Sequence, residues 1–297
     1  HWECPPGLGW VGDPGEKAMT TYANLAGVEV GDGFRVRLVG AINISPESFY
    51  QGSVSKDEGS LREKAEEMAA GGADVLDIGA MSTAPYLRTE ISEAEEVQRL
   101  VWAIGVVRNV ATIPISADTK RSRVARAALE AGAEIINDVS GLHHDPKMAE
   151  IIARHARGAI LMASETIPGA RDPIGTVCAL LEDGLQRLRG MGVPDDRVAV
   201  DPGIGFFRQA LIPWHAWDCE VLRRLGELQT IGRPIVVGLS RTSFIGQILG
   251  QKDPSERLVG SLAATAIAVV NGAHLIRTHD VGPTREAVRM AEALRPR

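Results

Sequence analysis

The sequence is poor in cysteine, in aromatic residues and in long apolar runs. It has three cysteines, Cys4, Cys178 and Cys219, and no C-x-x-C spacing. An odd count without that spacing gives no disulfide framework, zinc motif or redox motif, and it fits a reducing compartment. The first ten residues, HWECPPGLGW, lack the basic and apolar regions of a secretory signal peptide, so we expect a cytoplasmic protein.

Apolar stretches fall short of the roughly 20 unbroken residues that a membrane-spanning helix needs, so we expect no membrane association. The nearest candidate, LVGSLAATAIAVV at 258–270, is rich in small residues, which predicts a tightly packed buried helix. Positive charge is also in deficit, with 32 Lys and Arg against 38 Asp and Glu, a formal net charge of -6. Because proteins that bind a nucleic-acid backbone usually present a basic face, this balance argues against a nucleic-acid partner. It still allows a small anionic substrate, which a few local cations can bind.

From residue 35 onward, short apolar runs alternate regularly with longer amphipathic segments. Such apolar runs predict buried parallel strands, and the amphipathic segments predict helices. We expect strands at 35–43, 74–79, 113–118, 134–139, 158–163, 198–201, 234–239 and 274–279, and helices at 57–71, 92–110, 121–132, 146–157, 174–191, 217–230, 255–271 and 284–294. Eight alternations over about 260 residues predict an α/β fold, a (β/α)8 TIM barrel.

We expect one domain at 35–297, preceded by an N-terminal extension at 1–34 whose prolines and glycines predict irregular structure. An open, doubly wound sheet is the alternative fold, but the phosphate loop G-x-G-x-x-G is absent after the first predicted strand. Two helix boundaries are predicted by capping residues. Ser92 begins the second helix, and Gly71 with Gly72 ends the first.

Polar side chains end seven of the eight predicted strands. In a TIM barrel the active site lies at the carboxyl ends of the strands, so these side chains should meet at one mouth. Buried polar groups cost free energy unless partners compensate, which disfavours a chance origin for this pattern. The residues are Asn43, Asp77, Asp118, Asn137, Asp138, Asp201, Ser240, Arg241, Arg277 and His279.

Three of these residues form an acceptor-rich set on the middle strands. Asp118, Asn137 and Asp201 together supply two carboxylates and an amide. Such a set suits a planar heterocycle that offers several N–H donors.

A second set suits an anion. Asn43, Arg277 and His279 should be neighbours, because the first and last strands of a closed barrel are adjacent. The segment 240–243 lies between the seventh strand and the start of a helix, where backbone N–H groups attract negative charge. The predicted site therefore holds a donor-rich heterocycle beside a phosphate-like group.

Several polar residues have a structural interpretation. For Asp77 two interpretations are open: a role in the site, or a structural role in which it caps a loop or pairs within the barrel. Asp138 is expected to stabilise a turn. The run His143-His144-Asp145 could suggest a metal site, but we expect a solvated loop and helix start there. His215 is expected to pack in a loop.

Several of these segments, in their order along the chain, resemble those of the dihydropteroate synthase family. The similar blocks are NISPESF (43–49), STAP (82–85), SADT (116–119), IINDVSG (135–141), DPGIGF (201–206), LSRTSFIG (239–246), SERLVGSLA (255–263) and IRTHD (276–280). The ordered series, spanning 36–295, is specific for the superfamily of pterin-binding barrels.

The resemblance implies a transferase of folate biosynthesis that condenses 7,8-dihydropterin-6-ylmethyl diphosphate with p-aminobenzoate or a related arylamine. It also implies Mg²⁺ on the diphosphate and a homodimer. For the substrates, the resemblance implies a pterin site of Asp118, Asn137, Asp201 and Arg241, and a diphosphate site of Asn43, Thr83, Arg277 and His279. The implied second-substrate site consists of Ser240, Thr242, Ser243 and Arg208, and the implied metal ligand is Asn43. The implied catalytic residues are Asp118, Asn43, Arg277 and His279.

The chain departs from the family pattern on the second-substrate side. Ala84 stands where the family has Arg, and Thr242 stands where it has a Lys that touches both substrates. The second substrate could therefore be p-aminobenzoate or a larger arylamine, such as a ribosylated aminobenzene. Two other functions are open: a methyltransferase domain that uses a methyl-tetrahydropterin, and a non-catalytic pterin-binding protein. Retention of Asn43, Arg277 and His279 favours the synthase.

Overall fold

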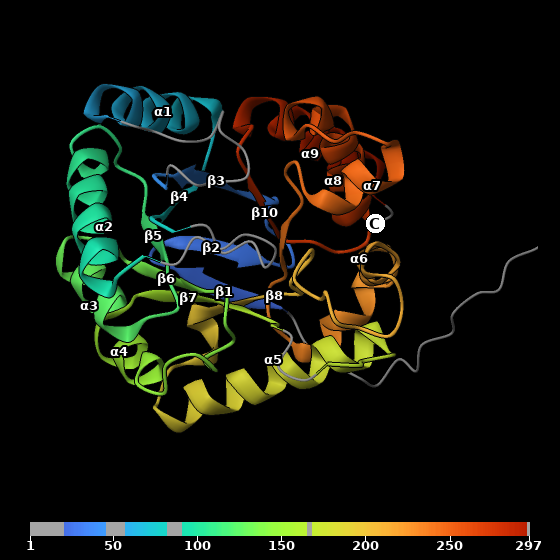
Figure 1. The fold of residues 1–297 in the computed structure, drawn as a ribbon, viewed down its shortest axis with the longest axis horizontal. Helices are drawn as coiled ribbons and strands as arrows, with labels where there is room; N and C mark the ends of the chain where they lie inside the picture. The colour runs from blue at the N-terminus through green and yellow to red at the C-terminus, as the bar shows by residue number, and fades with distance from the viewer. Residues whose placement is uncertain (1–20, 46–56, 82–90, 165–167, 296–297) are drawn as a thin grey trace, which may run out of the picture.

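The computed structural model describes residues 21–45, 57–81, 91–164 and 168–295. Parallel strands occupy the centre of the molecule and helices surround them (Figure 1). The central strands are β3 (Arg37–Asn43), β4 (Val75–Gly79), β5 (Ile115–Asp118), β6 (Ile135–Asp138), β7 (Gly158–Met162), β8 (Val198–Asp201), β9 (Val236–Gly238) and β10 (Leu275–Thr278). The helices are α1 (Glu58–Gly71), α2 (Glu93–Arg108), α3 (Ser122–Glu130), α4 (Met148–His155), α5 (Pro173–Gly190), α6 (Trp214–Arg223), α7 (Ser243–Leu249), α8 (Leu258–Val270) and α9 (Val281–Leu294).

The sheet closes on itself. Its strand order is β8-β7-β6-β5-β4-β3-β10-β9, and all pairs are parallel. The two ends of this order meet where Val200 of β8 forms a parallel bridge with Ile235. The amide of Val200 also donates to the carbonyl of Pro234 at 2.9 Å. The prediction of a (β/α)8 barrel is therefore confirmed.

The strands are nearly continuous apolar runs because both of their faces are buried. Every residue of β4 through β8 is buried. The predicted helix ends are also found: Ser92 caps α2 by accepting the amide of Glu95 at 3.2 Å. Gly72 ends α1 with a φ of 100°, a left-handed conformation that favours glycine.

A β-hairpin covers one end of the barrel. It consists of β1 (Tyr22–Leu25) and β2 (Val28–Gly31), so the prediction of irregular structure for 1–34 is wrong for this segment. Leu25 and Val30 pack with Val75 and Leu275, the first residues of β4 and β10. Since the hairpin buries the amino ends of the strands, the carboxyl ends form the mouth.

The helices near the C-terminus differ in detail from the prediction. The segment expected at 217–230 is α6 followed by a 3-10 helix, η3 (Leu225–Ile231), and the one expected at 255–271 is a 3-10 turn, η4 (Pro254–Arg257), followed by α8. Burial of α8 is confirmed for one face only, because Val259 is 77% exposed and Ile267 is 55% exposed. None of the helices in the described ranges is long and apolar enough to cross a membrane.

Candidate active site

Strand register brings the first predicted site residues to one level of the mouth. Asn43 at the end of β3 is opposite Gly79, and Gly79 is opposite Asp118. Asp118 at the end of β5 is in turn opposite Asn137 of β6. Because these are neighbouring parallel strands, an amide, a carboxylate and a second amide lie side by side, far apart in sequence but adjacent in space.

An ion pair inside the barrel joins the two predicted sets. Arg277 of β10 donates through Nε to Asp77 Oδ2 at 2.7 Å and through Nη2 to Asp118 Oδ2 at 3.2 Å. Asn137 Nδ2 donates to the same Asp77 oxygen at 3.1 Å. Asp77 has no exposed surface. The alternative left open for Asp77 is thus resolved: it pairs within the barrel, directly beneath the predicted site residues.

Burial raises the pKa values of the two carboxyls in the acceptor-rich set. Desolvation, followed by the negative charge of Asp77, raises the pKa of Asp118 to about 7 despite the opposing effect of Arg277. Desolvation also raises the pKa of Asp201, at the end of β8, to about 6. Among the described residues, Oδ1 of Asp77 and Oδ1 of Asp118 have no hydrogen-bond partner. Buried polar atoms are nearly always hydrogen-bonded, so the unsatisfied Oδ1 of Asp118, at the mouth of the barrel, suits a ligand that offers an N–H donor.

His279 follows β10 and is buried at the same mouth. Its Nδ1 lies 3.1 Å from the carbonyl oxygen of Ala41, and its amide donates to Ser240 Oγ at 3.2 Å. Burial and the charge of Arg277 lower the pKa of His279 to about 4. The ring is therefore neutral at physiological pH, and the tautomer that donates through Nδ1 fits the contact with Ala41.

The residues predicted for the second substrate lie between β8 and α7. Arg208 donates through Nε to the carbonyl of Gly205 at 2.8 Å, and its guanidinium carbon lies 4.0 Å from the centre of the Trp214 ring. Its Nη2 also donates to Ser243 Oγ. The hydroxyl of Thr242 donates to the carbonyl of Leu239 at 3.1 Å. Arg208 and Ser243 are thus brought together, whereas the Thr242 hydroxyl stabilises its own turn.

The turn after β8 requires glycine at a close approach of two chain segments. Gly203 has a φ of +74°, and a Cβ added there would collide with the carbonyl oxygen of Ala163, the residue after β7. The amide of Gly203 donates to Asp201 Oδ1 at 2.8 Å. The turn therefore fixes the Asp201 carboxylate at the mouth.

A buried carboxylate that sequence reasoning missed supports the same turn from below. Asp218 of α6 has no exposed surface and accepts the amide of Gly205 at 2.9 Å. Desolvation raises the pKa of Asp218 to about 7. Next to it, Trp217 stacks on Phe207 with 4.6 Å between ring centres. An Asp among aromatic residues at a helix start carries no chemical motif, so its role emerges only from the packing.

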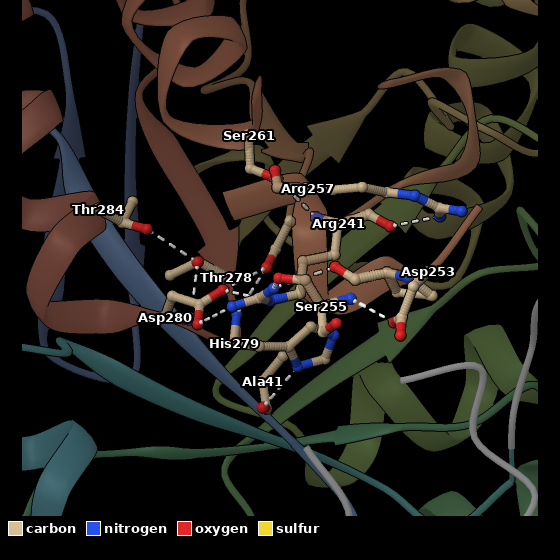
Figure 2. A network of polar contacts seen from close by, with 12 residues as sticks. Ala41, Arg241, Asp253, Ser255, Arg257, Ser261, Thr278, His279, Asp280 and Thr284 are labelled. Atoms are coloured by element: carbon tan, nitrogen blue, oxygen red, sulfur yellow. Dashed lines mark hydrogen bonds and ion pairs between the residues drawn. The ribbon is translucent and has the colours of Figure 1, made fainter. Parts of the chain in front are cut away.

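Arg241, predicted to contact the pterin, directs its guanidinium into a protein network (Figure 2). Nε and Nη2 donate to the two carboxylate oxygens of Asp280, each at 2.9 Å. Thr83, predicted for the diphosphate, lies outside the described residues, as does Ala84.

Asp138 behaves as predicted, whereas the prediction for His215 is wrong: His215 was expected in a loop but is the second residue of α6, with its ring 5.5 Å from that of Trp214. Asp138 accepts the amides of Ser140 and Leu142, so it stabilises a turn. Asp145 accepts the amides of Ser122 and Lys147. No group of three potential metal ligands from His, Cys, Asp and Glu occurs within the ranges that the structure describes.

Comparison with known proteins agrees with this geometry. The family model described as pterin binding enzyme matches residues 39–279. The dihydropteroate synthase of Synechocystis sp. is 36% identical over 269 residues, covering 88% of this chain and 91% of the relative. The dihydropteroate synthase of Escherichia coli K12 is 34% identical over 263 residues, covering 86% and 90%.

Two solved structures carry informative ligands. The dihydropteroate synthase of Thermus thermophilus in complex with 6HMPPP has a TM-score of 0.77 and 37% identity, covering 92% of this chain and 99% of that one. The Coxiella burnetii enzyme in complex with pteroic acid has a TM-score of 0.82 and 33% identity, covering 93% and 99%. With a family match over most of its length and relatives above 30% identity, this chain belongs to the dihydropteroate synthase family of pterin-binding enzymes.

Proposed function

We propose that the protein is a dihydropteroate synthase, which transfers a dihydropterin-6-ylmethyl group from diphosphate to the amino group of an arylamine. The observation that carries this proposal is the pairing of Arg277 with both Asp77 and Asp118. It puts a cation at the junction between a carboxylate set suited to a pterin and an anion site suited to diphosphate.

The pterin would lie against Asp118, Asn137 and Asp201. A pterin edge offers ring and exocyclic N–H groups, which complement carboxylate and amide oxygens. Because burial raises the pKa of both carboxyls, N–H donors from the ligand would favour their ionised forms. Binding and deprotonation are therefore coupled in this proposal.

The diphosphate would lie against Asn43, Arg277 and His279, with Thr83 assigned by resemblance. Magnesium is assigned to Asn43, whose donor chemistry fits it: the side-chain amide at the end of β3 offers an oxygen, the ligand atom that Mg²⁺ prefers. Mg²⁺ usually binds one or two protein oxygens and completes its shell with water and substrate phosphate. When bound, it would neutralise charge on the diphosphate.

The chemistry follows from these assignments. The bond between the exocyclic carbon and the diphosphate oxygen breaks, and the electron pair leaves with diphosphate. Arg277 stabilises that departing charge, since fixed charges in a desolvated site act where charge develops. The carboxylates of Asp118 and Asp201 stabilise the pterin as its exocyclic carbon becomes electron-poor. The amine nitrogen then forms a bond to this carbon, and its extra proton passes to water or to the departing diphosphate.

The second substrate would enter between the turn after β8 and the start of α7. Arg208 supplies a cation there and Ser243 a hydroxyl, with Ser240 and Thr242 in the adjoining loop. A cation and a hydroxyl suit the carboxylate of p-aminobenzoate or of a larger arylamine.

We also propose a homodimer in the cytoplasm. Exposed apolar side chains on α7, α8 and α9 support the dimer, because α7 and α9 both pack against α8 and exposed apolar surface can mark an interface. They are Ile248, Leu249, Val259, Ile267, Met290 and Leu294. Val259→Glu should yield a monomer in sedimentation analysis if this patch is the contact.

Release of pyrophosphate tests the function. Purified protein is incubated with 7,8-dihydropterin-6-ylmethyl diphosphate, Mg²⁺ and p-aminobenzoate, and both products are quantified. Equal amounts of pyrophosphate and dihydropteroate are expected. If no arylamine yields pyrophosphate, while a methyl-tetrahydropterin donates its methyl group to a corrinoid partner, the protein is a methyltransferase. Pterin binding without either reaction would indicate a non-catalytic protein.

A further inference from the structure

Arg241 has an unusual backbone conformation for its residue type. Its φ is +57°, in the left-handed region that non-glycine residues rarely adopt. Residues in this region persist when the surrounding structure determines their conformation, and they gather at functional sites. Arg241 lies in the loop after β9 and is only 5% exposed, so the cause must lie in its buried contacts.

The guanidinium of Arg241 joins three segments of the chain. Its Nε and Nη2 form a two-pronged ion pair with Asp280, which precedes α9. Its Nη1 donates to the carbonyls of Pro254 at 3.0 Å and Ser255 at 2.7 Å, in the η4 turn before α8. Four of its five N–H groups therefore point at acceptors in two other loops.

The backbone of Arg241 is held as well. Its amide donates to Ser261 Oγ at 2.8 Å, and its carbonyl accepts from Arg257 Nη1 at 3.1 Å. Arg257 is itself buried and also donates to the carbonyls of Gln251 and Lys252. Figure 2 shows Arg241 among Ser261, Arg257 and Asp280. The left-handed conformation is thus fixed by partners to the side chain, the amide and the carbonyl.

The side chain of Asp280 pairs with Arg241 and does not cap its own helix. It occupies the N-cap position of α9, where an aspartate usually accepts amides of its own helix, but it makes no such bond. Instead its amide donates to the Thr278 hydroxyl at 3.0 Å, and that hydroxyl lies 2.9 Å from the hydroxyl of Thr284. The Asp280 carboxylate is thereby directed to Arg241.

The ion pair between Arg241 and Asp280 lies between the residues proposed for the diphosphate and those proposed for the arylamine. Ser240 Oγ donates to Asp280 at 3.3 Å and accepts the amide of His279 at 3.2 Å. On the other side, Thr242 and Ser243 begin α7 and adjoin the second-substrate region. Ser240, Thr242 and Ser243, the neighbours of Arg241 in the chain, are all assigned to the arylamine, so a shift of Arg241 would move that part of the site.

We infer that Arg241 is a positioning residue, whose ion pair with Asp280 fixes the loop between β9 and α7 and so sets the arylamine half of the site. This inference rests on the proposed synthase activity. It replaces a direct contact between Arg241 and the pterin, because the guanidinium donates to protein acceptors. Lysine cannot substitute, since one ammonium group cannot reach a carboxylate fork and two carbonyls together.

Four variants test this role. Arg241→Lys keeps the charge, Arg241→Gly keeps the left-handed backbone without the guanidinium, and Asp280→Asn removes the charge of the partner. Arg189→Lys is the matched control, because Arg189 forms a similar two-pronged pair with Asp195 beside η2 (Asp195–Arg197), at the opposite end of the barrel. For each variant we would measure the Kd of 6-hydroxymethyl-7,8-dihydropterin, the KM of p-aminobenzoate, and amide hydrogen exchange over 239–246.

We expect all three Arg241 and Asp280 variants to raise the KM of p-aminobenzoate roughly tenfold or more, with pterin Kd changed by less than about threefold. Exchange of the 239–246 amides should accelerate in the same variants, and Arg189→Lys should match wild type. The inference is overturned if pterin Kd weakens as much as the arylamine KM, or if Arg241→Gly behaves as wild type. Should Arg241→Lys fail to fold, Asp280→Asn still decides. If amide exchange over 239–246 is unchanged in the variants, the positioning role is rejected whether or not the protein is a synthase. If the wild type releases no pyrophosphate, only the proposed synthase activity is rejected.

Discussion

Arg277 Nε lies 2.7 Å from Oδ2 of Asp77, a carboxylate without exposed surface and 200 residues away in sequence. The same guanidinium reaches Asp118 at the mouth of the barrel. A buried carboxylate below and a site carboxylate above thus hold one cation in place. Arginine is suited to this position because its planar group can serve several acceptors at once.

Asp77→Asn should destabilise the protein and slow the reaction, although Asp77 need not touch substrate. The change leaves the Arg277 charge less compensated, and removing one partner of a buried ion pair costs about 3 kcal/mol or more. Urea unfolding measures this loss. Asp195→Asn is the control: its partner Arg189 is 39% exposed, and such surface pairs contribute about 1 kcal/mol or less. Similar losses in the two variants would contradict a buried anchor at Asp77.

The contribution of Asp118 to stability should fall as pH rises from about 4 to about 7. Burial raises the pKa of Asp118 from its ordinary value of 3.8 to about 7, so in this window the folded state binds a proton that the unfolded state has released. The unfolding free energy therefore decreases with pH, on the order of 1–3 kcal/mol for this group. Asp118→Asn should flatten the dependence when unfolding is measured across this range.

Asp218 provides the control for that experiment, because burial also raises its pKa to about 7. Asp218→Asn should flatten the pH dependence of stability too. Only Asp118→Asn should also remove the strengthening of pterin binding as pH rises through about 7. If both variants leave pterin binding equally dependent on pH, Asp118 is not the carboxylate that receives the ligand.

Gly203→Ala should disrupt the turn after β8. The new Cβ would meet the backbone oxygen of Ala163 in a left-handed conformation, and backbone cannot move aside as a side chain can. Gly192→Ala is a matched control, with a φ of +81° and nothing within 4 Å of its Cβ. We expect Gly203→Ala to lose about 2 kcal/mol more unfolding free energy than Gly192→Ala. Equal losses would show that the two segments are not in close approach.

Thr242→Lys should improve use of p-aminobenzoate. A lysine there would add a cation near the expected carboxylate, and we predict a fall in KM of about five- to tenfold. Thr230→Lys controls for charge, since its hydroxyl also donates to a carbonyl three residues earlier, at Glu227, on a different part of the barrel. A KM unchanged by Thr242→Lys, with a larger arylamine preferred by wild type, would indicate a different second substrate.

The barrel and its strand ends could be predicted from the sequence for a physical reason. Asn43, Asp118, Asn137 and Asp201 are polar residues that end apolar runs, and parallel strands bring such ends to one mouth. Hydrophobic periodicity and composition are local properties of a sequence, so they can locate the strands and the polar residues that end them.

Residues whose roles depend on distant partners could not be assigned in the same way. Asp280 is separated from Arg241 by 39 positions, and Asp218 supports Gly205 only because α6 packs under the turn after β8. The hairpin at 22–31 was missed because two four-residue strands carry little periodicity, and its burial depends on the barrel floor it covers.

The most direct test is a pair of titrations on two variants, Asp118→Asn and Arg277→Lys. One titration measures the affinity for 6-hydroxymethyl-7,8-dihydropterin, and the other measures the affinity for pyrophosphate in the presence of Mg²⁺. A site divided into a carboxylate half and an anion half predicts opposite effects: Asp118→Asn loses mainly pterin affinity, and Arg277→Lys loses mainly pyrophosphate affinity. Equal loss of both ligands in both variants would contradict that division.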